Sequence, residues 1–265
     1  MSATPRLVAT DLDGTLLAAD GTVSPRTREV LAALDARQVP VVFVTGRPIR
    51  WMESLWEAVG GHGLAICSNG GIVYDVSEHV VRTALTIDPS TAVEVGRALR
   101  QAVPGTSFAL EKTGGFAREE SFLPRVPPPS DIPVGPLERL VDRTVVKILA
   151  RHEEHPPEGF WRRVEEAVGS LVTTTWSSTG ALVEMSAHGV TKASTLERLC
   201  AELDVAAADV VAFGDMPNDI PLLQWAGHSY AMDNAHPSVL ATAVHRAPAH
   251  DLDGVATVLA ELFDL

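Results

Sequence analysis

The chain has 265 residues, of which 46% are hydrophobic and 21% charged, the composition of an ordinary folded globular protein. It contains 21 Lys and Arg against 34 Asp and Glu, and the resulting net charge of −13 argues against a nucleic-acid-binding protein, because phosphate backbones attract basic surfaces. The sequence has no signal-peptide pattern at its start and no run of about 18 apolar residues, so we expect a cytoplasmic protein without a membrane partner.

The cysteine content indicates the same compartment. Cys67 and Cys200 are the two cysteines of the chain, too few for a metal cluster or a disulfide framework. We therefore expect both to be buried thiols in a reducing environment.

The first part of the chain alternates short apolar runs with segments of helical period. The apolar runs predict strands at Leu7–Thr10, Val41–Val44 and Leu64–Cys67. Ser24 is a suitable helix cap and Pro25 a suitable first helical residue, so a helix is expected from there to about Arg37. Pro48 predicts the start of a second helix, which would end near Val59.

The pattern changes between Thr83 and His188. Predicted helices and strands now follow one another without regular alternation: helices at Ser90–Gln101 and Gly159–Val168, and strands at Phe108–Leu110, Thr144–Ala150, Leu171–Trp176 and Ala181–Met185. Prolines between Pro124 and Pro136 predict an extended loop. This stretch is typical of a separate α+β module inserted into the surrounding fold.

Strand and helix alternate again after the inserted module. In chain order we expect a helix at Ala193–Leu203, a strand at Val210–Phe213, a helix from about Asn218, a strand near Tyr230–Met232 and a last helix from Gly254. Such alternation predicts an α/β fold with a Rossmann-like, doubly wound, mostly parallel sheet. The predicted domains are a core of residues 1–83 and 189–265 and an inserted α+β domain of residues 84–188.

Two aspartates follow the first predicted strand, in the run Asp11-Leu12-Asp13-Gly14-Thr15. Open α/β sheets bind their ligands at the carboxyl ends of the strands, so these carboxylates are candidates for a functional site. A surface turn is the alternative interpretation, because Asp-Gly is a common turn pair. A calcium-binding loop is excluded, because it requires Gly and Glu where this chain has Leu16 and Thr22.

A second acidic cluster, Gly214-Asp215-Met216-Pro217-Asn218-Asp219, follows the strand predicted at Val210–Phe213. Four aspartates in two strand-end loops would repel one another unless a cation lay between them, and oxygen ligands favour magnesium over zinc. The same residues are also typical of a helix start, in which Asp215 would cap a helix that Pro217 opens. The two interpretations are compatible, because a capping residue can also bind a metal.

Two further elements carry groups suited to an anion. Thr45-Gly46-Arg47-Pro48 lies between a predicted strand and a predicted helix, so its hydroxyl and N–H groups indicate an anion site at a helix N-terminus, with a simple turn as the alternative. Lys192 stands at the start of a predicted helix, where the helix dipole disfavours a cation. A solvent-exposed lysine would tolerate this position at small cost, whereas a bound phosphate would make it favourable.

In this order and at these strand ends, the four motifs resemble those of the haloacid dehalogenase superfamily of aspartate-nucleophile phosphatases. The matching segments, from the first motif to the fourth, are Asp11–Thr15, Thr45–Arg47, Lys192 and Gly214–Asp219. Asn69-Gly70-Gly71, the large insertion and Ala231-Met232-Asp233-Asn234-Ala235 resemble the Cof-like branch, whose sugar-phosphate phosphatases carry an α/β cap at this position. The chain departs from that branch at Ala193, where Gly is usual, and in Pro237–Ala243, which lacks a common lysine.

The resemblance implies a Mg²⁺-dependent phosphatase that forms an aspartyl-phosphate. Asp11 would be the nucleophile and Asp13 the general acid and base, and the metal would be held by Asp11, Asp215 and the backbone carbonyl of Asp13. The residues implied to bind the phosphoryl group are Thr45, Gly46, Lys192 and Asn218, and those implied to support the site are Asp219, Arg47 and Asn69.

The resemblance also implies a small phosphorylated metabolite, a sugar phosphate, as the substrate of a monomer or homodimer. In the inserted domain, Trp176, Arg118 and Glu184 are candidates for contact with the leaving group. A phosphomutase of the same superfamily is one alternative, and a phosphate-responsive regulatory or binding protein without turnover is another. Asp13 argues against the binding protein, which would need no acid or base two residues after Asp11.

Overall fold

The computed structural model describes residues 4–56, 63–176 and 180–265. The described chain divides into two compact units, which we call the core unit and the inserted unit. The core unit is Met1–Arg82 together with Lys192–Leu265, and the inserted unit is Thr83–Thr191. That the first is catalytic and the second a cap is a prediction from the sequence.

The core unit is built on a sheet of eight strands in the order β13-β12-β11-β1-β2-β3-β4-β5. In chain order the strands are β1 (Leu7–Thr10), β2 (Val41–Val44), β3 (Leu64–Cys67), β4 (Ile72–Asp75), β5 (Val80–Ala84), β11 (Val210–Gly214), β12 (His228–Met232) and β13 (His245–Ala247). The central strand β1 pairs in parallel with β11 and β2, and β3 pairs antiparallel with β4. Every residue of β1 is buried, as expected for a parallel strand covered on both faces.

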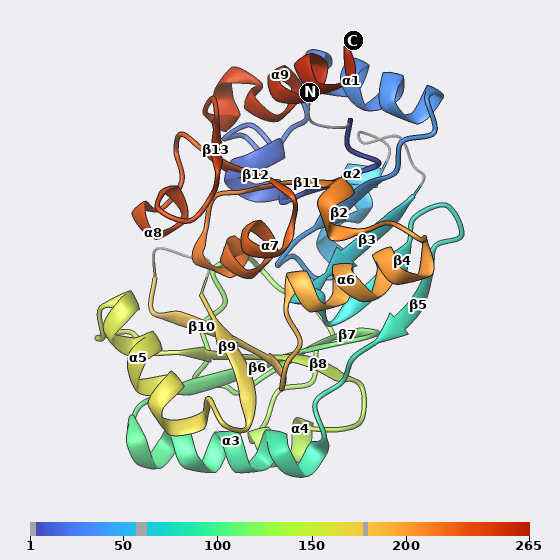
Figure 1. The fold of residues 1–265 in the computed structure, drawn as a ribbon. Coiled ribbons are helices and arrows are strands. Elements are labelled where there is room, and N and C mark those ends of the chain that lie inside the picture. Colours follow the sequence, from blue (N-terminus) through green and yellow to red (C-terminus); the bar gives the residue numbers. More distant parts are fainter. Residues whose placement is uncertain (1–3, 57–62, 177–179) are drawn as a thin grey trace. The chain divides into compact units, whose positions relative to one another are not determined.

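Helices cover both faces of this sheet (Figure 1). One face carries α1 (Pro25–Ala36) and α9 (Gly254–Phe263), and the other carries α6 (Lys192–Glu202) and α7 (Ile220–Trp225). The remaining helices of the core unit are the short α2 (Glu53–Trp56) and α8 (Pro237–Leu240). The sequence-based expectation of a doubly wound, mostly parallel α/β sheet is confirmed. No helix of the described residues is long and apolar enough to cross a membrane.

The inserted unit has its own sheet, in the order β7-β6-β8-β10-β9. Its strands are β6 (Ser107–Lys112), β7 (Gly115–Arg118), β8 (Val145–Arg151), β9 (Val172–Thr175) and β10 (Leu182–Ala187), and its helices are α3 (Pro89–Ala102), α4 (Leu137–Leu140) and α5 (Pro157–Val168). Neighbouring strands run antiparallel. The long helices α3 and α5 lie on one face, where Leu99, Phe108 and Phe160 belong to a single hydrophobic core.

Two predicted helices differ from the structure. After Pro48 the chain forms a 3₁₀ turn at Ile49–Trp51 and then the short α2, and the predicted end near Val59 lies outside the described residues. Ile and Trp are weak helix formers, which favours the tighter turn. The helix expected from about Asn218 begins at Ile220, after a 3₁₀ turn at Pro217–Asp219. Its first turn contains Pro221, which has no N–H and is tolerated only there.

Candidate active site

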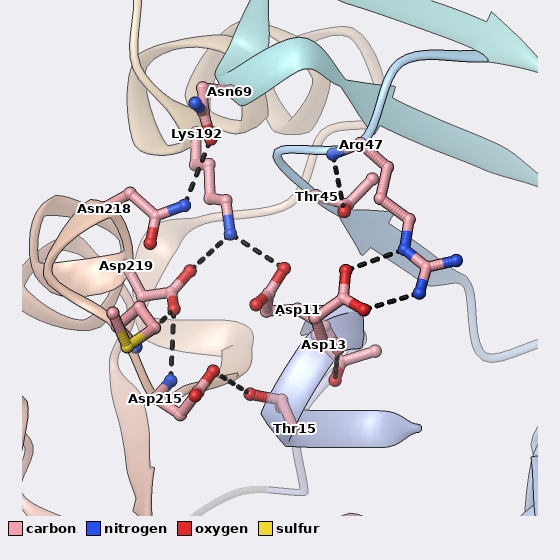
Figure 2. A network of polar contacts seen from close by, with 12 residues as sticks. Asp11, Asp13, Thr15, Thr45, Arg47, Asn69, Lys192, Asp215, Asn218 and Asp219 are labelled. Carbon is pink, nitrogen blue, oxygen red and sulfur yellow. Dashed lines mark hydrogen bonds and ion pairs between the residues drawn. The ribbon is translucent and has the colours of Figure 1, made fainter. Parts of the chain in front are cut away.

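The candidate site lies in the core unit, where loops follow the carboxyl ends of parallel strands. Asp11 follows β1, Thr45 follows β2 and Asp215 follows β11, while Lys192 is the first residue of α6. Parallel strands bring these ends to one edge of the sheet, and Figure 2 shows the side chains facing a common centre. The structure therefore assembles in one place residues that are up to about two hundred positions apart, as in the bond between Thr15 and Asp215, with a separation of 200.

Lys192 lies between two carboxylates. Its Nζ donates to Asp11 Oδ1 at 2.8 Å and to Asp219 Oδ1 at 2.6 Å, and its side chain has no exposed area. Burial alone would lower the pKa of Lys192, but the charges of Asp11 and Asp219 outweigh burial and raise it. The lysine is thus held in its charged form at a helix start where an unpaired cation would be disfavoured.

Asp215 approaches the loop after β1 closely. Thr15 Oγ1 donates to Asp215 Oδ1 at 2.9 Å. Gly14 has φ +74°, and a Cβ built there would lie 2.4 Å from Asp215 Oδ2, so only glycine fits. Burial, followed by the charge of Asp219, raises the pKa of Asp215 to about 7.

Both carboxylate oxygens of Asp219 accept hydrogen bonds from neighbouring groups of the site. Oδ1 accepts from Lys192, while Oδ2 accepts from the backbone N–H groups of Asp215 and Met216, each at 3.1 Å. The sequence interpretation in which Asp215 caps the following helix is therefore wrong. Asp219 reaches back to the loop instead, because the turn at Pro217–Asp219 directs its side chain toward the residues before it.

The buried carboxylates suit a divalent cation. Carboxylate oxygens of Asp11, Asp215 and Asp219 lie within 4.8 Å of one another. These three acids face one lysine, which leaves an excess of two negative charges, the charge of one Mg²⁺. Burial, followed by Asp219 and Asp215 in opposition to Lys192, raises the pKa of Asp11 well above its ordinary value. A bound cation would oppose this shift, because it favours the charged form of the carboxylates.

The oxygens available for that cation belong to Asp11 and Asp215. Within the described part of the chain, neither Asp11 Oδ2 nor Asp215 Oδ2 accepts a hydrogen bond, whereas both oxygens of Asp219 do. Oxygen ligands of this kind are those that Mg²⁺ prefers. The fit agrees with the predicted roles of Asp11 and Asp215, and it indicates that Asp219 is the least available of the three acids.

Asp13 is oriented by Arg47. The Arg47 guanidinium donates through Nε to Asp13 Oδ2 at 2.7 Å and through Nη2 to Asp13 Oδ1 (Figure 2). This two-point contact raises the pKa of Arg47. The Asp13 side chain is 59% exposed, so it stays accessible to water and to a ligand.

Of the remaining predicted residues, Thr45 lies beside Arg47, and Asn69 and Asn218 lie beside Lys192 (Figure 2). Thr45 Oγ1 accepts from the Arg47 N–H at 3.0 Å, and Asn218 Nδ2 donates to Asn69 Oδ1 at 3.1 Å. A Cβ on Gly46 would lie 3.1 Å from that same Asn69 oxygen. A three-residue 3₁₀ turn follows Pro48 instead of the expected long helix, and anion binding by Thr45 and Gly46 stays a prediction.

The three candidates in the inserted unit have different surroundings. Arg118 Nη1 donates to the backbone carbonyls of Glu119, Glu120 and Phe122, so it holds its own loop. Glu184 is buried and forms an ion pair with Lys147. Trp176 follows β9 and is half-buried. Contact of these residues with a leaving group stays a prediction.

Thr15 and Asn234 belong to motif segments of the sequence but have no role predicted from it. Thr15 bonds Asp215, as described above. Asn234 Nδ2 donates to the backbone carbonyl of Gly14 at 2.8 Å. Their positions within the family motifs could have marked both residues as candidates. Their partners could not be predicted, because each lies far away in the chain.

The raised pKa of Asp215 predicts how stability depends on pH when metal is removed. The folded-state pKa of about 7 lies above the ordinary 3.8, so folding favours the protonated form, and stability is lost as pH rises between these values. In a chelator, we expect the melting temperature to fall more between about pH 5 and about pH 7.5 in the wild type than in Asp215→Asn. Equal falls in the two proteins would contradict the shift.

Comparison with known proteins places the chain among related sequences and folds. Residues 8–259 match the family model of haloacid dehalogenase-like hydrolases. The chain is 31% identical to the HMP-PP phosphatase of Serratia proteamaculans, with 88% of this chain and 86% of that protein covered. It is 30% identical to a phosphoglycolate phosphatase of Methanopyrus kandleri, with 97% of each covered. The crystal structure of SMU.1108c from Streptococcus mutans has the same fold, with a TM-score of 0.85, 18% identity and coverage of 98% of this chain and 100% of that one.

Proposed function

The chain belongs to the haloacid dehalogenase-like hydrolase family, in its Cof-like branch, and from this premise we propose that it is a Mg²⁺-dependent sugar-phosphate phosphatase that works through an aspartyl-phosphate on Asp11. It is a phosphoric monoester hydrolase, and its relatives are phosphatases of small phosphorylated metabolites. The observation that carries the proposal is the arrangement of Asp11, Lys192, Asp215 and Asp219, with Asp13 two residues after Asp11.

In the first step an Asp11 oxygen attacks phosphorus. The new oxygen–phosphorus bond forms as the bond to the leaving oxygen breaks, which leaves an acyl-phosphate on the enzyme. The Lys192 ammonium, 2.8 Å from Asp11 Oδ1, orients the carboxylate and neutralises part of its charge. Mg²⁺, held by Asp11, Asp215 and the Asp13 carbonyl, would supply the positive charge that allows an anionic nucleophile to approach an anionic ester.

Asp13 serves both steps as acid and base. It gives a proton to the leaving oxygen in the first step and takes one from the attacking water in the second, which regenerates the Asp11 carboxylate and releases phosphate. The two hydrogen bonds from Arg47 hold the Asp13 carboxyl in one orientation. Its exposed side chain is consistent with access to both the leaving group and water.

Four groups of the site hold the phosphoryl oxygens. Thr45, Gly46, Lys192 and Asn218 supply a hydroxyl, a backbone N–H, an ammonium and an amide, all suited to an anion. Asn69 holds the Asn218 amide through its hydrogen bond. Asp219 keeps Lys192 in place, since its second oxygen is tied to the backbone of the same loop.

Turnover of a small chromogenic phosphate ester, with Mg²⁺ and in a chelator, tests this function against a protein that only binds phosphate. Release of phosphate that requires Mg²⁺ supports the proposal, and stoichiometric binding without release would support the regulatory alternative. A set of phosphorylated metabolites then identifies the substrate. A phosphomutase would return the phosphoryl group to a sugar, so it would give an isomeric sugar phosphate instead of free phosphate.

We assign substrate choice to the inserted unit. Its sheet carries the hydrophobic core on one face, and the pleat directs Lys147 and Glu184 to the other, where they form a buried ion pair. A leaving-group hydroxyl that reaches this pair gains a hydrogen bond to the carboxylate or the ammonium, whereas a leaving group without that hydroxyl gains none. The core unit then supplies the chemistry for all substrates.

Glu184→Gln tests the role of the inserted unit. We expect kcat/KM for the best natural substrate to fall about tenfold or more, while that for the small chromogenic ester stays within about twofold. Glu158→Gln is the control, because Glu158 makes a surface ion pair with Arg162 on α5. Trp176→Ala provides a second variant if the first has a lowered melting temperature. Equal losses on both substrates, or none, would exclude control of specificity by these residues.

A further inference from the structure

The loop after β12 is bonded to both loops that carry the acidic cluster. Asn234 Nδ2 donates to the backbone carbonyl of Gly14 at 2.8 Å, and the backbone N–H of His236 donates to the carbonyl of Asp215 at 2.8 Å. Asn234 Oδ1 accepts from the backbone N–H of His250 at 3.0 Å. Residues 234–236 thus form a brace, by which we mean the segment that joins the loop of Asp11–Thr15 to the loop of Asp215.

The brace acts where the two loops are packed most tightly. Gly14 lies so close to Asp215 that a Cβ would approach Oδ2 to 2.4 Å, and Thr15 bonds the other oxygen of the same carboxylate. A shift of the Gly14 peptide would therefore move both its neighbour Asp13, whose carbonyl belongs to the proposed metal site, and the contacts of Asp215. Metal affinity depends on ligands held within about 0.5 Å of their places.

We propose that Asn234 is a positioning residue for the metal site. Its side-chain amide fixes the Gly14 peptide, and through it the distance between the loop after β1 and Asp215. This inference rests on the proposed function, because it assigns the acidic cluster to a divalent cation. The half of the brace made by His236 is a backbone contact, so a side-chain substitution at Asn234 releases only the Gly14 half.

If Asn234 only stabilised the fold, removal of its side chain would lower the melting temperature without weakening metal binding. Asn234 is exposed, so water can replace its hydrogen bonds when the side chain is removed, and the cost in stability is expected to be small. Water cannot hold the Gly14 peptide in one position, however. Loss of the amide should therefore weaken metal binding much more than it lowers the melting temperature.

Asn234→Ala and Asn234→Asp separate position from charge. The aspartate keeps the acceptor toward His250 but has no N–H for Gly14, and it adds a negative charge that by itself would strengthen cation binding. If position decides, both variants bind Mg²⁺ about tenfold or more weakly, as is typical when a group that orients metal ligands is lost. Asp233→Asn is the control, because Asp233 is the exposed neighbour and its side chain is no part of the brace.

The measurement is calorimetric titration of the substrate-free protein with Mg²⁺, together with the melting temperature in a chelator. The expected result is weaker binding by both Asn234 variants, wild-type binding by Asp233→Asn and melting temperatures within about 3 °C of the wild type, a shift that corresponds to less than about 1 kcal/mol. Wild-type affinity in Asn234→Ala, or tighter binding by Asn234→Asp, would overturn the inference and leave the proposed function intact. Absence of Mg²⁺ binding by the wild type would overturn both.

Discussion

Replacement of Asp11 by Asn or Ala is expected to abolish turnover of phosphate esters and to leave the protein folded. Neither an amide nor a methyl group can form the acyl-phosphate, so kcat should fall by on the order of 10⁴-fold, the scale seen when a member of a catalytic group is removed. Single-turnover assays with the chromogenic ester and with the best natural substrate measure this loss.

The fold should survive because the substitution relieves repulsion. Burial and the neighbouring Asp219 and Asp215 raise the pKa of Asp11, so its charged form is unfavourable in the metal-free protein. Lys192 would lose one of its two partners but keep Asp219 at 2.6 Å. The melting temperature of Asp11→Asn in a chelator should therefore equal or exceed that of the wild type.

Asp209→Asn is the matched control for this substitution. The Asp209 side chain makes a long contact of 3.9 Å with Arg6, and its backbone hydrogen bonds survive the substitution, so Asp209→Asn should retain wild-type turnover. Retention of more than about a tenth of the activity by a folded Asp11→Ala protein would count decisively against Asp11 as the nucleophile.

The strands that the sequence predicted well are those buried on both faces. β1, β2 and β3 have the predicted bounds, because each is a run of four apolar or β-branched residues whose burial needs no knowledge of its neighbours. β5 (Val80–Ala84) was missed for the opposite reason. All five of its residues are exposed at the sheet edge, so it has no pattern of burial, and only its pairing with β4 makes it a strand.

The site shows the same division between local and distant information. Motif spacing indicates which residues gather at the strand ends. It does not indicate which of them form hydrogen bonds with one another, because the bonded residues are distant in the chain. Lys192 and Asp11 are separated by 181 residues, and Asn234 and Gly14 by 220. The local sequence pattern predicted a capping role for Asp215, but in the structure Asp219 accepts the backbone hydrogen bonds at this turn. The pattern could not decide between them, because a residue in a turn can direct its side chain either forward or back along the chain.

Removal of Mg²⁺ is expected to abolish activity, Ca²⁺ is expected to inhibit, and Asp215→Ala should raise the Mg²⁺ concentration for half-maximal activity by about a hundredfold or more. Asp215 offers a buried oxygen to the cation, and loss of a ligand exceeds the effect of losing a residue that only orients one. Ca²⁺ has a larger and looser coordination shell, so it would hold the Asp11 carboxylate in a position unsuited to attack.

Thr15→Val distinguishes the contribution of the Asp215 carboxylate from that of the hydrogen bond that orients it. Valine has the size of threonine but cannot donate to Asp215 Oδ1, so the carboxylate remains while the 2.9 Å hydrogen bond is lost. We expect an increase of about tenfold in the Mg²⁺ requirement, between the wild type and Asp215→Ala. Magnesium titrations of initial rate for the three proteins give this order. Full activity after exhaustive chelation, or an unchanged Mg²⁺ requirement in Asp215→Ala, would remove the metal from the mechanism and leave the excess charge of the three buried acids over Lys192 without a proposed counter-ion.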